Sequence, residues 1–192
     1  MVIDGGEGYA GGMADPEGLV YREDFVSEAE EAQLLDLLAA IEFRTLTMRG
    51  QTARRTVRHF GLGYEYESGE LAPTDPLPEP MLPLRDRCAE LMERAPEDLV
   101  QTLVSRYPPG AGIGWHRDAP MFGSKIAGVS LRAACRMRFQ RTLKGERSTA
   151  ELELAPRSAY LLSGKARWSW QHSIPATKEL RYSVTFRTLK RG

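Results

Sequence analysis

The chain has 192 residues, of which 42% are hydrophobic and 27% are charged, and its formal net charge is zero. This composition is typical of one soluble globular domain, and neutrality argues against strong non-specific binding of nucleic acid. No apolar run approaches the ~18 residues of a membrane span, and the N-terminus does not resemble a signal peptide. Two cysteines, Cys88 and Cys135, are typical of a reducing cytoplasm. We therefore expect a cytoplasmic monomer that does not enter a membrane.

The charges are unevenly placed along the chain. Residues 1–40 carry ten acids and one base, whereas residues 131–192 carry fourteen bases and four acids. The basic part could attract a polyanion such as nucleic acid, but a solvated basic face with no partner would have the same composition. Charge alone leaves both interpretations open.

The N-terminal part of the sequence predicts a flexible leader followed by helices. Residues 1–18 are rich in Gly, Asp and Glu and lack periodic apolar positions, so we expect one domain over residues 19–192. Ser27 and Glu30 form a capping-box pattern, which predicts a helix with an apolar face made by Leu34, Leu35, Leu37, Leu38 and Ile41. A second helix is predicted over residues 81–94, after a proline-rich loop at residues 71–80.

After residue 98 the apolar period changes to two, which indicates short strands rather than helices. Eight runs have this pattern: 99–107, 112–118, 125–131, 135–141, 150–154, 158–164, 167–173 and 181–189. Helices followed by many short strands predict an α+β, mainly β fold. We expect a double-stranded β-helix (jelly roll) with the N-terminal helices packed on one sheet.

The segment GWHRDAP places His116 and Asp118 two residues apart. On a strand these side chains would point to one face and could hold one ion. His172, in a later strand-like run, is the natural third ligand. Two histidines and one carboxylate form the facial triad of non-haem Fe(II) oxygenases, although zinc can use the same ligands.

The last run, RYSVTFRTL, alternates polar and apolar residues. Its two faces would carry Arg181, Ser183, Thr185 and Arg187 on one side and Tyr182, Val184 and Phe186 on the other. An ordinary amphipathic strand with its polar face in water explains this pattern. An inward-facing arginine, by contrast, needs an anion, and a guanidinium matches a carboxylate such as either end of 2-oxoglutarate.

These motifs occur together in one order: SRYPPGAGIGWHRD, then His172, then R-x-S-x-x-x-R. In this order they resemble the AlkB family of Fe(II)/2-oxoglutarate dioxygenases over residues 99–189, and more weakly through RRTVRHFGLGYEY upstream. The resemblance implies Fe(II), with 2-oxoglutarate and O2 as cosubstrates. It also implies hydroxylation of a substrate C–H bond, coupled to conversion of 2-oxoglutarate to succinate. A hydroxylated carbon attached to nitrogen is then released as an aldehyde.

The resemblance assigns roles to individual residues. His116, Asp118 and His172 match the iron ligands. Arg181 matches the arginine that pairs with the distal carboxylate of 2-oxoglutarate, Arg187 matches the arginine near the metal-bound end, and Tyr107 matches a tyrosine that hydrogen-bonds the cosubstrate. Ser105 and Ser183 stand where many members have asparagine, so as cosubstrate contacts they would have a shorter reach.

The substrate is less clearly indicated. Several base-repair members have an acid two positions beyond the ligand aspartate, where this chain has Pro120 after Ala119. The segment RRTVRHFGLGYEY resembles a substrate-covering lid, in which Arg54, Arg55 and Arg58 would contact phosphates and Tyr64 would stack on a base. A solvated hairpin would look the same.

We therefore expect oxidative dealkylation of nucleobases in DNA or RNA, as in repair. The alternatives are demethylation of protein lysine and hydroxylation of a modified tRNA base. A non-catalytic binding module would lack a ligand or an arginine of the pattern, and none is missing. A zinc hydrolase would not need Arg181 and Arg187.

Overall fold

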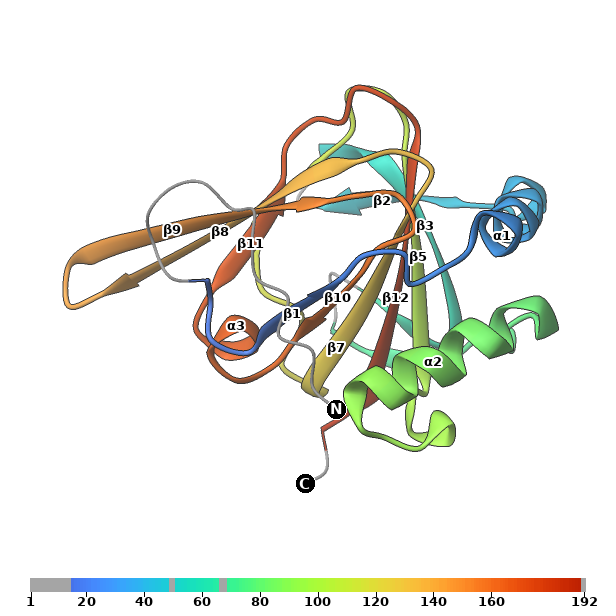
Figure 1. Cartoon of the computed structure of the whole chain (residues 1–192), viewed down its shortest axis with the longest axis horizontal. Coiled ribbons are helices and arrows are strands. Elements are labelled where there is room, and N and C mark those ends of the chain that lie inside the picture. The colour runs from blue at the N-terminus through green and yellow to red at the C-terminus, as the bar shows by residue number, and fades with distance from the viewer. Residues whose placement is uncertain (1–14, 49–50, 66–68, 191–192) are drawn as a thin grey trace.

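Twelve strands form two antiparallel sheets within residues 15–48, 51–65 and 69–190, which the computed structural model describes (Figure 1). The large sheet has the order β1 (Leu19–Arg22), β10 (Ala159–Leu162), β7 (Phe122–Leu131), β12 (Arg181–Leu189), β5 (Gln101–Tyr107), β3 (Gln51–Tyr64) and β2 (Arg44–Met48), with β4 (Leu71–Pro73) also paired to β3. The small sheet has the order β6 (Ile113–His116), β11 (Gln171–Ile174), β8 (Cys135–Leu143) and β9 (Glu146–Leu154). The predicted jelly roll is confirmed.

Two helices cover the face of the large sheet that is remote from the small sheet (Figure 1). Helix α1 (Glu28–Ala40) begins with the predicted capping box: Ser27 Oγ accepts from the Glu30 amide at 3.2 Å, and the Glu30 carboxylate accepts from the Ser27 amide at 2.9 Å. Helix α2 (Leu82–Met92) lies between 3₁₀ turns at Glu79–Met81 and Pro96–Asp98. In the described part of the chain, no helix is long and apolar enough to cross a bilayer.

Strand β12 lies between β7 and β5 and separates two buried regions. Tyr182, Val184 and Phe186 join the core that packs under the helices. The alternate positions face the interior between the two sheets, where a second apolar cluster forms around Phe139, Trp170 and Ile174. The polar face of this strand is therefore buried, and the interpretation that it lies in water is wrong.

Several local expectations differ from the structure. The proline-rich stretch contains β4, which pairs with β3. The predicted strand over residues 167–173 is only partly correct, because α3 (Gly164–Trp168) includes Arg167 and Trp168 and β11 begins only at Gln171. Strand β6 ends at His116, so Asp118 reaches the site from a loop and not from the same strand face. The periodicity of a short segment does not by itself distinguish a paired strand from a helix or a loop.

The expected leader lies only partly within the described residues. Residues 1–14 lie outside them. The next four residues end in a turn against α3, where the Gly18 carbonyl accepts from Ser163 Oγ at 2.9 Å and Glu17 pairs with Lys165. The end of the segment predicted as a leader therefore contacts the domain.

Ser27→Ala should lower the free energy of unfolding by about 1 kcal/mol, because it removes the side-chain acceptor at the start of α1. Urea denaturation at neutral pH measures this change. Ser148→Ala, on the hairpin of β8 and β9, is a matched control that should change stability by less than about 0.5 kcal/mol. Equal effects of the two variants would contradict the capping role.

Candidate metal and cosubstrate site

A cavity of about 550 Å³ lies between the two sheets. This volume is typical of a small-molecule site. It collects residues that are far apart in the sequence, and most of the predicted site residues line it: Arg55, Tyr64, Ser105, Tyr107, His116, Asp118, His172, Ser183 and Arg187. Arg181 lies behind this wall, packed over the Tyr107 ring at 5.1 Å.

The three predicted iron ligands meet at one end of the cavity. His116 on β6 pairs in register with His172 on β11, and their ring centroids are 4.2 Å apart. His172 Nε2 and Asp118 Oδ2 are 3.6 Å apart. Ligand atoms held at right angles around one ion lie about 3 Å apart. Among the described residues, no three histidine, cysteine, aspartate or glutamate side chains are close enough together to surround one ion as they stand.

The environment of the two histidines is suited to metal binding. His116 Nδ1 is 2.9 Å from the Gly114 carbonyl, to which it can donate, and this leaves Nε2 free as a ligand. Burial lowers the pKa of His172 to about 3 and also lowers the pKa of His116. Both imidazoles are therefore neutral at pH 7, which is the form that binds a metal.

Asp118 is held as a carboxylate. Burial alone would raise its pKa, but the charge of Arg187 and the neighbouring histidines outweigh burial and hold the pKa below its usual range. Arg187 forms a direct ion pair with Asp118, and its other terminal nitrogen donates to Gln101 Oε1 at 2.9 Å. Arg187 thus already has an anionic partner within the chain.

Arg181 has no such partner. Its side chain is fully buried, its Nε donates to Ser130 Oγ at 3.0 Å, and both terminal nitrogens are buried without a hydrogen bond in the described structure. The Cys135 thiol is close, but burial raises its pKa, so it stays neutral and does not offset the charge. No described carboxylate lies within 4 Å of Arg181. A buried guanidinium with two open donors fits one carboxylate of 2-oxoglutarate.

Arg167, which the sequence pattern did not single out, holds the loop that carries Asp118. It lies on α3 and is 2% exposed. Its guanidinium donates to four main-chain carbonyl oxygens at 2.9–3.3 Å, those of Asp118, Ala119, Phe122 and Gly123. In the sequence it is one of many basic residues, and only its burial shows this role.

The predicted lid residues do not share one surface. Strand β3 pairs with β5 from Thr56 to Gly61, so this segment is part of the large sheet. Arg55 is buried in the cavity wall and donates to Ser105 Oγ at 3.3 Å, whereas Arg58 is paired with Asp75 and only Arg54 is exposed. Of the expected lid at 47–66, residues 49, 50 and 66 lie outside the described residues.

Tyr64 lines the cavity, and its ring meets Phe122 edge-on at 5.9 Å. Its placement brings it to the same cavity as Arg55. The single phosphate-binding role expected for all three arginines does not match their positions.

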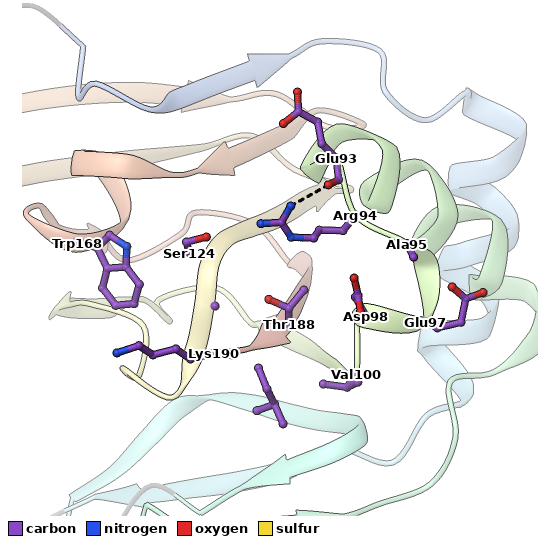
Figure 2. A pocket seen from close by; sticks show the side chains of 12 residues that line it. Glu93, Arg94, Ala95, Glu97, Asp98, Val100, Ser124, Trp168, Thr188 and Lys190 are labelled. Carbon is purple, nitrogen blue, oxygen red and sulfur yellow. Dashed lines mark hydrogen bonds between the residues drawn. The ribbon is translucent and has the colours of Figure 1, made fainter. Parts of the chain in front are cut away.

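A second, larger hollow of about 870 Å³ lies outside the jelly roll (Figure 2). The residues after α2 form one side of it, and Trp168 and Lys190 lie on the other. Arg94 donates to the Glu93 carbonyl at 2.9 Å. This hollow contains no histidine or cysteine and mixes acidic with basic side chains, so the smaller cavity is the better candidate site.

The sequence profile of the 2OG-Fe(II) oxygenase superfamily matches residues 18–187, which include every residue of the cavity described above. The chain belongs to this superfamily. Fe(II), 2-oxoglutarate and O2 are the metal and cosubstrates of the superfamily, in agreement with the expectation from the sequence.

Three curated relatives confirm that the oxygenase is AlkB-like. An Arabidopsis thaliana protein named "Alkylated DNA repair protein ALKBH8 homolog" is 33% identical over 188 residues, covering 84% of this chain and 51% of that protein. The Xenopus tropicalis "tRNA (carboxymethyluridine(34)-5-O)-methyltransferase alkbh8" is 30% identical over 171 residues, covering 85% and 26%. The Danio rerio "Probable RNA/DNA demethylase ALKBH6" is 28% identical over 149 residues, covering 77% and 60%.

The oxygenase thus spans about a quarter of the length of the Xenopus relative and half of that of the Arabidopsis relative. A solved structure of OsALKBH1 shares its fold, with a TM-score of 0.71 at 15% identity. That match covers 92% of this chain and 99% of that chain.

Arg167→Gln should weaken binding of a divalent metal by about 10- to 100-fold, because the loop that carries Asp118 loses its anchor. Titration with Co(II) or Mn(II), alongside the thermal midpoint, separates metal affinity from folding. Lys165→Gln, on the exposed face of the same helix, is the control and should leave metal affinity unchanged. A variant that unfolds earlier yet binds metal normally would contradict the positioning role.

Proposed function

We propose that this oxygenase removes an alkyl group oxidatively from a nucleobase in DNA or RNA. The observation that carries the oxidative part is the occurrence of two features, one in the wall of the cavity and one directly behind it. The first is a neutral His116, a neutral His172 and an ionised Asp118 that converge. The second is the buried Arg181 guanidinium, which lacks an anion. The nucleic-acid part is supported by two relatives, one named as an alkylated DNA repair protein homologue and one as a probable RNA/DNA demethylase.

In this proposal His116, Asp118 and His172 hold the iron. Arg181 pairs with the distal carboxylate of 2-oxoglutarate, and the Tyr107 hydroxyl hydrogen-bonds the cosubstrate. Arg187 keeps Asp118 ionised and oriented, and lies near the metal-bound end. When bound, the iron supplies the centre at which O2 is reduced as 2-oxoglutarate loses CO2 and becomes succinate.

The chain itself contributes geometry. Three ligands leave coordination positions open, and the cavity walls exclude bulk water from the reacting carbon. One oxygen atom of O2 enters succinate and the other is inserted into a substrate C–H bond. When that carbon is attached to nitrogen, the hydroxylated product loses it as an aldehyde, and the unmodified base is restored.

A nucleobase must leave its stack to reach such a cavity. Tyr64 offers a stacking surface, and Arg55 offers donors to a carbonyl oxygen of the base. Arg54, which is exposed, is the member of the arginine group placed to meet a phosphate. This division of roles replaces the common phosphate contact expected for the three arginines.

A second candidate is hydroxylation of a modified tRNA base without loss of the carbon. It is favoured by relatives named as tRNA carboxymethyluridine methyltransferases, with 29–30% identity over 85% of the chain. Arg55 suits this substrate too, because a guanidinium in the cavity can pair with a carboxyl group. Demethylation of protein lysine is a third possibility, which the substrate panel distinguishes from the other two.

A substrate panel tests the proposal: methylated single-stranded DNA, methylated RNA, modified tRNA and methyl-lysine peptide, each with Fe(II) and 2-oxoglutarate. We expect succinate and formaldehyde with a methylated nucleic acid. Hydroxylated tRNA base with no aldehyde would favour the second candidate, and turnover of the peptide alone would overturn both.

Asp118→Ala should abolish succinate formation and weaken metal binding, whereas Glu146→Ala, at the exposed hairpin end, should not.

Affinity for an oligonucleotide should fall with rising salt, because phosphate contacts release counterions. Arg54→Ala should reduce the log–log salt slope by about one. Arg58→Ala is the matched control on the same strand, and should change the slope less because Arg58 is already paired with Asp75. Filter binding or fluorescence anisotropy at several salt concentrations measures the slope. Equal slopes for wild type and Arg54→Ala would exclude the Arg54 contact.

A further inference from the structure

Strand β9 forms an edge of the small sheet. It pairs with β8 along its whole length, and no segment of the described residues pairs with its other side. The hairpin of β8 and β9 extends away from the body of the protein (Figure 1). An unpaired strand edge presents a row of amide and carbonyl groups, to which another strand can add.

The turn of this hairpin determines which main-chain groups of β9 face outward. Lys144 and Gly145 form a two-residue turn with positive φ, closed by the pair of Leu143 and Glu146. The closing pair is hydrogen-bonded, and hydrogen-bonded pairs alternate with non-hydrogen-bonded pairs along an antiparallel ladder. The even-numbered residues of β9 therefore bond to β8. The residues whose amide and carbonyl groups face away from β8 are Arg147, Thr149, Glu151 and Glu153.

Two side chains near the ends of this edge carry opposite charges that no described residue neutralises. Arg147 is exposed, and its hydrogen bond at 2.6 Å is to the neutral side chain of Gln140. Glu153 is also exposed and forms no ion pair with a described residue, because the neighbouring Arg136 pairs with Glu151 at 3.4 Å. The edge therefore has a free cation near one end and a free anion near the other.

A second copy of β9, placed antiparallel about Ala150, matches this pattern. Arg147 and Glu153 are equally distant from Ala150, the middle residue of the strand, so each would lie opposite the other residue type in the second copy. Thr149 would lie opposite the second copy's Glu151, to which its hydroxyl can donate. All four of these residues have outward main-chain groups, so one ladder can form along the whole strand.

Other antiparallel registers fit less well. A shift of one residue sets outward main-chain groups opposite groups that already bond to β8. A shift of two residues in one direction places Glu151 opposite its own copy, and like charges directly opposite each other are destabilising. The same shift in the other direction places Glu153 opposite Gly145, beyond the end of the strand, and leaves its charge unpaired. Charge and hydrogen bonding thus favour the symmetric register.

We propose that the protein forms a two-fold symmetric dimer, in which the β9 strands of two copies pair antiparallel and join the two small sheets into one. A two-fold pairing uses each edge once, so the assembly closes and does not grow into a fibre. It also widens the projecting ribbon of β8 and β9, and two-stranded ribbons are only marginally stable alone. The inference goes beyond the proposed function and does not depend on it, and it differs from the monomer expected from the sequence.

Charge reversal tests the pairing. In sedimentation equilibrium over a range of protein concentrations, the whole chain should pass from dimer to monomer on dilution. Arg147→Glu should raise the dissociation constant of the dimer about tenfold or more, because two attractive cross-strand pairs become repulsive, and Glu153→Arg should do the same. Arg22→Glu is the matched control: it makes the same charge change on β1, an edge strand of the large sheet, and should leave the dissociation constant near wild type.

Mixing the two variants tests the register. Arg147→Glu and Glu153→Arg together restore both pairs of opposite charge, so the mixture should form a heterodimer with nearly wild-type affinity although each variant alone is weakened. Wild-type protein that stays monomeric up to its solubility limit would overturn the inference. A dimer that neither variant weakens, or a mixture that does not regain affinity, would also contradict it.

A main-chain substitution tests the same edge without changing charge. Thr149→Pro removes an amide that faces away from β8, so the monomer should keep its fold while the second copy loses a hydrogen-bond donor. We expect loss of the dimer with an unchanged far-UV circular dichroism spectrum. Thr149→Ala, which keeps the amide, is the control and should still dimerise. A Thr149→Pro protein that dimerises as wild type does would show that β9 is not the interface.

Discussion

Two guanidinium groups on β12 are buried between the sheets, and the organisation of the site depends on how each is neutralised. Burying a cation without a partner costs free energy. The anion that offsets this cost must come either from the protein itself or from a bound ligand. Arg187 is neutralised within the chain by Asp118. Arg181 meets a serine, an aromatic ring and a neutral thiol, none of which carries charge. Arg187 is thus paired within the protein, whereas Arg181, behind the cavity wall, is the guanidinium that the proposed function pairs with an anionic ligand.

The residues around the two arginines connect the proposed metal site to the proposed cosubstrate site. Asp118 is both the partner of Arg187 and the proposed iron ligand, and its loop is tied to α3 through Arg167. Strand β12 carries both arginines and also packs its apolar face under the helices. Ligands that occupy the cavity would therefore act on a strand that is buried along almost its whole length, and metal with 2-oxoglutarate should stabilise the protein as a whole.

The residues proposed to contact the substrate are divided between the cavity and the surface around it. Arg55 and Tyr64 lie in the cavity wall, whereas Arg54 is exposed. The hairpin of β8 and β9 extends away from the body of the protein and carries part of the basic C-terminal half (Figure 1). In the proposed function, base recognition and phosphate contact would use separate surfaces, so substitutions would alter them independently.

The sequence by itself determined the elements whose signals are local. The capping box predicted the start of α1, and the change of period at residue 98 predicted a jelly roll. The order of the motifs carried the resemblance to the AlkB family, and that resemblance predicted the site residues that the cavity brings together. Only the tertiary structure decided what depends on burial and distant pairing. The same alternating pattern is found in a strand with one face in water and in β12, whose two faces are both buried. Likewise, arginine occurs as exposed Arg54, as Arg58 paired with Asp75 and as buried Arg167. Side-chain periodicity records which residues share a face, whereas the strands that cover that face lie elsewhere in the chain.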